Sequence, residues 1–221
     1  MALALAFGLI GTPAAAATYV YTNVGDTNTI NLVGGPNGTV MPGLTAQLTW
    51  TLSTKGSFND WYFNYTLTNN SSAPVTAARF TSLGSDIAEN FNVAFVSGSV
   101  FTGLSSGPIS NGTNVDWCTK VGPNCAGGGG GGLTIGQSTS GLLRFITDPG
   151  TTQLTFSNIG VRVQSINASQ LGVRGGSALL TEATGGGGAA IPEPSTWALM
   201  IMGFGGAGAM LRRRRKQQVF A

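Results

Sequence analysis

Residues 44–53 read LTAQLTWTLS, and apolar and polar side chains alternate along the whole stretch. One side of the stretch carries only apolar residues, namely Leu44, Ala46, Leu48, Trp50 and Leu52. Successive side chains of a β-strand point to opposite faces of the sheet, whereas an amphipathic helix repeats about every 3.6 residues. The alternation therefore predicts a strand with one face in a hydrophobic core and the other in solvent.

The stretch DWYFNYTLTNN at residues 60–70 repeats the pattern with larger side chains. Its predicted inward residues are Trp61, Phe63, Tyr65 and Leu67, and its predicted outward residues are Tyr62, Asn64, Thr66 and Thr68. Residues 55–59 (KGSFN) separate the two stretches and contain the glycine and asparagine that favour a tight connection. We expect the two strands to be joined by a hairpin loop.

The rest of residues 18–184 extends the same period of two. Further strands are predicted at 19–24, 28–33, 77–83, 91–101, 133–137, 141–147, 152–157 and 159–166. Several of them are joined by Gly, Pro, Asn or Asp, and no stretch of the body shows a sustained helical period. Short strands without helices predict an all-β body, an antiparallel β-sandwich or jelly roll.

The positive charge of the chain is concentrated near its C-terminus. Of its 11 lysines and arginines, five form a consecutive run at 212–216, and the formal net charge is +3. Residues 18–188 hold the other six cations and seven acidic residues, a net charge of −1. Domains that bind nucleic acid carry a basic patch or stripe. We therefore expect no nucleic-acid partner.

The N-terminus is predicted to be a secretory signal peptide. Residues 2–10 are almost wholly apolar, and residues 14–17 are alanines that suit the small-residue positions of a signal peptidase site. We expect a signal helix over residues 1–17, with cleavage between Ala17 and Thr18. No Lys or Arg precedes the apolar run, and the alternative is a short buried helix.

The C-terminal part combines a linker with an apolar segment that ends in cations. Residues 185–190 (GGGGAA) form a flexible linker. The apolar run at 197–211 has 15 residues, about 22 Å as a helix against the ~30 Å of a bilayer core. It predicts a short transmembrane helix that stays in the inner membrane only transiently. The basic stop that follows should remain cytoplasmic and leave the body periplasmic; it consists of Arg212, Arg213, Arg214, Arg215 and Lys216.

Three features occur in order at residues 191–216: the Pro192-Glu193-Pro194 box, the Trp197-Ala198 pair, and the apolar run closed by arginines. In this combination the segment resembles the PEP-CTERM sorting domain, in its PEPxxWA form. The resemblance implies export by a Gram-negative bacterium that makes exopolysaccharide, and cleavage by an exosortase at or near the motif. It places the mature protein at the cell surface or outside the cell. A plain membrane anchor with a proline-marked boundary is the alternative.

Cys118 and Cys125 are the two cysteines of the chain, and six residues separate them. In an oxidising compartment this spacing predicts a disulfide that closes a small loop. The alternative is a metal site, but two thiols in a chain without histidine rarely hold zinc.

The glycine run at 127–132 lacks the Gly-Lys-Ser/Thr of a phosphate loop and predicts a mobile connection. The cysteine pair and the glycine run, together with LTFSNIGVRVQSI at 154–166, resemble the cistern family of PEP-CTERM proteins.

Few side chains of the body suit catalysis. The chain has no histidine, which excludes a Ser-His-Asp triad and removes the commonest general base. Turn capping is the expected role of most acidic residues of the body, which are Asp26, Asp60, Asp86, Glu89, Asp116, Asp148 and Glu182. Asp86 and Glu89 lie three positions apart and are an alternative calcium pair. We predict no catalytic residue, no metal and no cofactor.

Three functions are compatible with these residues. The preferred one is a non-enzymatic protein of the cell surface or extracellular matrix. The second is a carbohydrate-binding module for the exopolysaccharide, in which an exposed Tyr62 stacks on a sugar ring. The third is a glycan hydrolase, because two carboxylates suffice for that reaction. The threonines at 45–51 form one outward rank, which suits a solvated strand face better than an ice-binding array.

Overall fold

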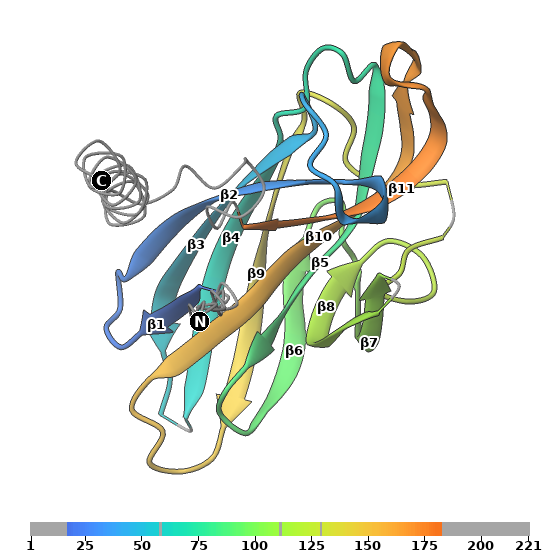
Figure 1. Ribbon diagram of the computed structural model, residues 1–221. Coiled ribbons are helices and arrows are strands. Elements are labelled where there is room, and N and C mark those ends of the chain that lie inside the picture. Colours follow the sequence, from blue (N-terminus) through green and yellow to red (C-terminus); the bar gives the residue numbers. More distant parts are fainter. Residues whose placement is uncertain (1–16, 58, 111, 129, 183–221) are drawn as a thin grey trace, which may run out of the picture. The chain divides into compact units, whose positions relative to one another are not determined.

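A computed structural model describes residues 17–57, 59–110, 112–128 and 130–182 (Figure 1). These residues form strands joined by turns, with two 3-10 turns and no α-helix among them. Residues 1–16 of the predicted signal helix, the linker at 185–190 and the sorting segment at 191–216 lie outside the described residues. Within the described ranges, no helix has the length and apolar character needed to span a membrane.

The strands are bounded as follows: β1 Thr18–Tyr21, β2 Thr27–Gly35, β3 Thr45–Lys55, β4 Asp60–Asn69, β5 Ala77–Ile87, β6 Phe91–Gly98, β7 Gly103–Ser110, β8 Thr113–Lys120, β9 Ser138–Thr147, β10 Leu154–Ala168 and β11 Val173–Glu182. The 3-10 turns are η1 Pro36–Gly38 and η2 Ser169–Leu171. The all-β prediction is confirmed.

All eleven strands belong to one antiparallel sheet. Its order is β6-β9-β4-β3-β2-β11-β10-β5-β8-β7, and β1 pairs with β10 outside this path. A sandwich would have two separate sheets, whereas here β2, β11 and β10 connect one half of the sheet to the other. The sheet curls until its two end strands, β6 and β7, come close to each other. The expected sandwich is thus replaced by a single sheet that is nearly closed.

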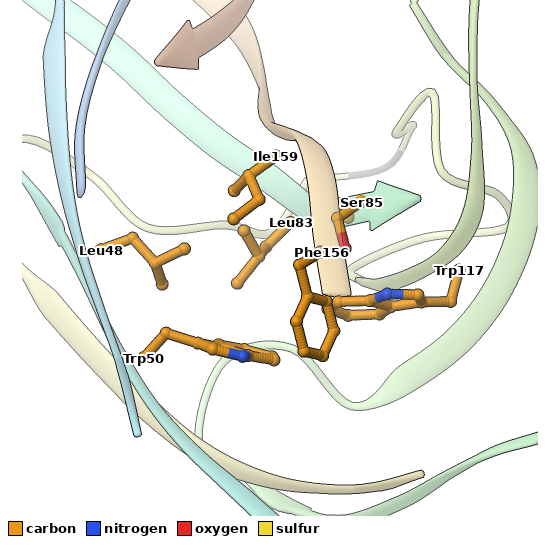
Figure 2. A pocket seen from close by; sticks show the side chains of 8 residues that line it. Leu48, Trp50, Leu83, Ser85, Trp117, Phe156 and Ile159 are labelled. Atoms are coloured by element: carbon orange, nitrogen blue, oxygen red, sulfur yellow. The ribbon is translucent and has the colours of Figure 1, made fainter. Parts of the chain in front are cut away.

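An aromatic cluster fills the inside of the curled sheet. Trp50 of β3 stacks on Trp117 of β8 with ring centroids 5.7 Å apart, although five steps in the strand order separate these strands (Figure 2). Phe156 of β10 meets Trp50 edge-on at 5.5 Å, and Tyr21 of β1 meets Phe63 of β4 at 5.1 Å. Such pairs stabilise a core beyond the burial of their area. They hold the two halves of the sheet against each other.

The two strands that predicted the fold have the predicted faces. The inward residues are all buried; they are Leu44, Ala46, Leu48, Trp50 and Leu52 around β3, and Trp61, Phe63, Tyr65 and Leu67 in β4. The strands pair in register from Ala46 opposite Asn69 to Lys55 opposite Trp61, with one shift after Leu52. The predicted hairpin is therefore confirmed.

Three predicted strands, at 152–157, 159–166 and 133–137, differ from the structure. The stretches 152–157 and 159–166 form one strand, β10, whose alternation is broken where Asn158 and Ser165 adopt positive φ angles of 50° and 54°. Register shifts accompany both positions, as expected for β-bulges. The stretch 133–137 is no strand and contributes one isolated bridge, between Leu133 and Phe80.

Three strands were not predicted at all. β7 (GLSSGPIS), β8 and β11 (VRGGSALLTE) lack a clean alternation, and β7 and β11 contain glycines while β7 also contains a proline. Their pairing comes from neighbours distant in the chain, since β8 pairs with β5 and β11 pairs with β10 and β2. Tertiary context decides strand formation where the local propensity is weak.

We expect Trp50→Ala to lower the free energy of unfolding by about 3–5 kcal/mol, because it removes the ring at the centre of the aromatic cluster. Thr49→Ala is the matched control on the opposite face of the same strand and should cost less than about 1 kcal/mol. Urea unfolding followed by circular dichroism measures both. Equal costs for the two variants would contradict the packing described.

The core also predicts a pH dependence. Burial raises the pKa of Tyr21 and of Tyr65 to about 12 from the ordinary 10.0. The unfolded chain ionises first, so this stability is fully present below pH 10.0 and is lost as the pH rises toward about 12. Tyr65→Phe should reduce the loss, as measured by urea unfolding across this range. If the free energy of unfolding fell with pH as steeply in the variant as in the natural chain, Tyr65 would titrate as an exposed tyrosine.

Candidate functional site

The outward side of β2, β3, β4 and β9 carries a regular array of uncharged side chains, here called the uncharged face, in which every member except Leu142 is polar. The strand registers align twelve residues in three ranks across the four strands. The ranks are Thr27, Thr51, Asn64 and Leu142; Thr29, Thr49, Thr66 and Ser140; and Asn31, Gln47, Thr68 and Ser138. The sequence indicated one rank along a single strand, whereas the sheet assembles three ranks across four strands.

Hydrogen bonds between neighbouring strands order the side chains of this face. The hydroxyls of Thr66 and Ser140 lie 2.9 Å apart, and the Gln47 amide donates to Asn31 Oδ1 at 3.2 Å. Neighbouring strands are about 4.8 Å apart, and residues two positions apart along a strand are about 6.7 Å apart. Apart from Leu142 at one corner, the face is therefore a grid of hydroxyl and amide groups without formal charge, suited to hydrogen bonding with a neutral polar surface.

An ion pair lies beside one end of the uncharged face. Arg144 Nη2 of β9 donates to Asp60 Oδ2 of β4 at 2.7 Å, and this hydrogen bond raises the pKa of Arg144. The same guanidinium lies 6.0 Å from the ring centroid of Tyr62. Tyr62 points outward as predicted but is half-buried, not exposed. A sugar stacking on Tyr62 would have to share the ring with Arg144.

The acidic residues of the body hold turns and strand ends together. Asp26 accepts hydrogen bonds from the backbone N–H groups of Asn23 and Thr22, both at 2.7 Å, which lower its pKa. The other acceptor pairs are Asp86 with Asn158, Glu89 with the Thr155 N–H, Asp116 with the Ile87 N–H, Asp148 with Asn90, Asp60 with Arg144, and Glu182 with the Tyr19 hydroxyl. Each of the seven carboxylates thus has a structural partner.

The two carboxylates of the alternative calcium pair have different hydrogen-bond partners in the structure. Asp86 accepts from Asn158 Nδ2 at 2.6 Å, while Glu89 accepts from the backbone N–H of Thr155 at 2.8 Å. Among the residues with defined positions, no three His, Cys, Asp or Glu side chains gather as metal ligands. Calcium takes six to eight oxygen ligands, so these two carboxylates alone do not define a site.

The predicted disulfide joins Cys118 and Cys125, and both cysteines are fully buried. It closes the turn that leaves β8, next to Ile109 and Val115. The Ser82 hydroxyl of β5 donates to the Cys125 carbonyl at 2.5 Å. The disulfide prediction is confirmed, and the bridge fixes the start of the glycine run against β5.

The described residues of the glycine run, which was predicted to be a mobile connection, pack along β5. Arg79 Nη1 donates to the Gly130 carbonyl at 2.8 Å, and Leu133 exchanges backbone hydrogen bonds with Phe80 at 2.9 and 3.0 Å. A Cβ on Gly132 would lie 2.5 Å from the Phe80 carbonyl oxygen, and its φ is +129°. Glycine is therefore required there for the loop to approach the strand.

The cavity in Figure 2 belongs to the core. It measures about 10 Å³ and is lined by residues such as Leu48, Trp50 and Trp117. A cavity of about 10–15 Å³ accommodates a single water molecule. The indole N–H groups of Trp50 and Trp117 and the Ser85 hydroxyl have no hydrogen-bond partner within the described part of the chain. The space is too small for a substrate.

Comparison with known proteins identifies the C-terminal segment. Residues 190–215 match the family model described as the PEP-CTERM protein-sorting motif, and they include the Pro192-Glu193-Pro194 box and Trp197-Ala198. The chain carries a PEP-CTERM sorting domain. The motif indicates an exported protein that is sorted by an exosortase. No curated protein and no solved structure matched the chain, and the resemblance to the cistern family is not confirmed.

The PEP-CTERM segment follows a body whose two ends lie side by side. Thr18, the predicted first residue after signal cleavage, begins β1 and pairs with Ser157 of β10. The Tyr19 hydroxyl donates to Glu182, the last residue of β11. Ala17 is described and precedes β1, whereas the sorting motif and the basic stop at 212–216 lie beyond the described residues.

Proposed function

We propose that the body is a non-enzymatic module of the cell surface or extracellular matrix, delivered there by the PEP-CTERM segment. The observation that supports it is the engagement of all seven carboxylates of the body in structural hydrogen bonds. The chain also has no histidine. The groups that would carry acid–base chemistry instead stabilise turns and strand ends, which disfavours a glycan hydrolase.

The proposed route has three stages. Signal peptidase cleaves between Ala17 and Thr18, and the helix at 197–211 then holds the chain in the inner membrane with the body in the periplasm. The basic stop at 212–216 stays on the cytoplasmic side. An exosortase cuts at or near residues 192–194, and the linker at 185–190 lets it reach the motif while the folded body stands clear.

Replacing Pro192, Glu193 and Pro194 by alanine should leave the C-terminal tail attached, because the exosortase no longer recognises its motif. The measurement is the intact mass of the mature protein from the native host. We expect the natural chain to end near residue 192 and the variant to retain residues up to Ala221.

Ser195 provides the matched control, because it lies between the Pro192-Glu193-Pro194 box and the Trp197-Ala198 pair and belongs to neither. Ser195→Ala should therefore be processed like the natural chain. A natural chain whose mass still includes the cations at 212–216 would make the segment an ordinary membrane anchor.

A second candidate function is binding of neutral glycan, which the uncharged face supports. Its hydroxyl and amide groups form a grid across four strands, so several sugar hydroxyls can be bound at once. Single hydrogen bonds contribute only about 1 kcal/mol each. An extended array of them suits a long polymer, which gains affinity by repeated contacts.

The double variant Thr49→Val/Thr66→Val removes two hydroxyls from the central rank while keeping the side-chain shape. We expect its affinity for a neutral polysaccharide such as dextran or xyloglucan to fall by at least about tenfold in affinity electrophoresis, because two hydrogen bonds are lost. Thr152→Val, at an exposed position outside the face, is the control. Equal retardation of both variants, or none for the natural chain, would contradict the glycan-binding candidate.

A further inference from the structure

A groove of about 220 Å³ opens on the surface where β5 begins. Three chain segments form it: the first residues of β5, the loop that follows the glycine run, and the bulged part of β10. Its lining residues are Thr76, Ala77, Ala78, Arg79, Thr134, Ile135 and Ser165. This volume is many times larger than the about 10–15 Å³ that a single water molecule needs. It is below the about 300–1,000 Å³ typical of pockets for drug-sized ligands, so it suits one small unit.

Arg79 gives the groove a single positive charge. The other six lining residues are uncharged. Within the described part of the chain, Arg144 and Asp60 form the one salt bridge, so Arg79 has no carboxylate partner there. Its Nη1 donates to the Gly130 carbonyl at 2.8 Å. This bond uses one of the five N–H donors of a guanidinium, holds the side chain in place and leaves other donors for an anion.

Ser165 lines the groove and has a strained backbone conformation. Its φ is +54°, in the left-handed region that non-glycine residues seldom adopt. It lies in the β10 bulge, where the register shifts between Gln164 and Asn167 against β5. Bulges often re-aim a side chain beside a functional site, and strained positions cluster at ligand clamps. Ser165 is exposed and lines the groove.

The other hydroxyls of the groove are already oriented by the protein. Thr76 Oγ1 donates to the Asn167 carbonyl at 3.1 Å, and Thr134 Oγ1 donates to Gln137 Oε1 at 2.8 Å. Each hydroxyl therefore donates its own hydrogen to the protein and offers its oxygen as an acceptor. Ile135 and Ala77 add an apolar wall. The groove thus combines one cation, fixed hydroxyl acceptors and an apolar surface.

We propose that this groove binds a carboxylate-bearing sugar unit, a hexuronate, of an acidic polysaccharide. The guanidinium of Arg79 receives the carboxylate, because its planar donors match the two oxygens. The hydroxyls of Thr76 and Thr134 accept hydrogen bonds from ring hydroxyls, and the C–H face of the ring packs on Ile135. The inference rests on the proposed surface role of the body, adds an anionic ligand class to it, and uses residues outside the uncharged face.

Galacturonate and galactose are the matched probes, because they differ at C6, where one carries a carboxylate and the other a hydroxymethyl group. Titration calorimetry of the purified full-length chain measures both sugars, first as monomers and then as short oligomers. We expect galacturonate to bind at least about tenfold more tightly than galactose, as a charge-assisted hydrogen bond predicts. Equal affinity, or no binding of galacturonate oligomers, would overturn the proposal.

Arg79→Gln should abolish the preference for galacturonate, whereas Arg174→Gln, at an exposed arginine outside the groove, should keep it. Circular dichroism and the thermal midpoint show whether Arg79→Gln folds, and Arg79→Lys, which keeps the charge, should retain part of the preference. A folded Arg79→Gln chain with unchanged preference would overturn the proposal. So would equal competition by acetate, which would indicate a site for any carboxylate.

Glycan binding by the uncharged face and hexuronate binding by the groove can be tested independently. Thr49→Val/Thr66→Val should leave galacturonate binding unchanged, because none of its substitutions lines the groove. Loss of galacturonate binding in that variant would overturn the assignment to the groove. The mass of the processed tail tests the sorting route independently of either ligand.

Discussion

The stacking of Trp50 on Trp117 is the contact on which the arrangement of the body depends. The two rings come from opposite halves of one sheet, and they can meet only if the sheet curls back on itself. Phe145 and Phe156 meet Trp50 edge-on, and Phe63 stacks on it. A sheet of eleven strands that stayed open would leave this aromatic side in water. Curling buries it and brings the end strands β6 and β7 close together.

Curling also determines which surfaces are available for function. The inward residues pack in the core, and the cavity near the tryptophans holds no more than one water molecule. Binding must therefore use the outside of the sheet or its ends. The outside offers the uncharged face on β2, β3, β4 and β9, and the groove beside Arg79 at the start of β5. The disulfide and the glycine run that packs on β5 position the groove.

The sequence revealed what depends on local pattern and missed what depends on distant partners. Alternation in 44–53 and 60–70 was enough to identify two strands and their buried faces, and spacing was enough to pair Cys118 with Cys125. The groove could not be predicted, because Arg79, Thr134 and Ser165 come from three segments. The bulge at Ser165 has no glycine to mark it.

The uncharged face shows the same limit in another form. Each strand displays its own hydroxyl side chains, and the threonines of 45–51 were visible in the sequence as one rank. The threonines of this strand align with the hydroxyl side chains of the neighbouring strands because of the strand registers. Examples are Thr49 opposite Thr66 and Thr66 opposite Ser140. Registers between strands distant in the chain are set by packing of the core, which one sequence does not display.

The central claim is that the body works outside the cell, separated from the tail that brought it there. The chain has three lysines, at positions 55 and 120 in the body and 216 in the tail. Intact cells of the native host can be treated with a membrane-impermeant amine reagent, and the protein then analysed by peptide mass spectrometry. The account predicts label on Lys55 and Lys120 and no peptide containing Lys216 in the mature protein. Unlabelled Lys55 and Lys120 in a chain that retains Lys216 would contradict it.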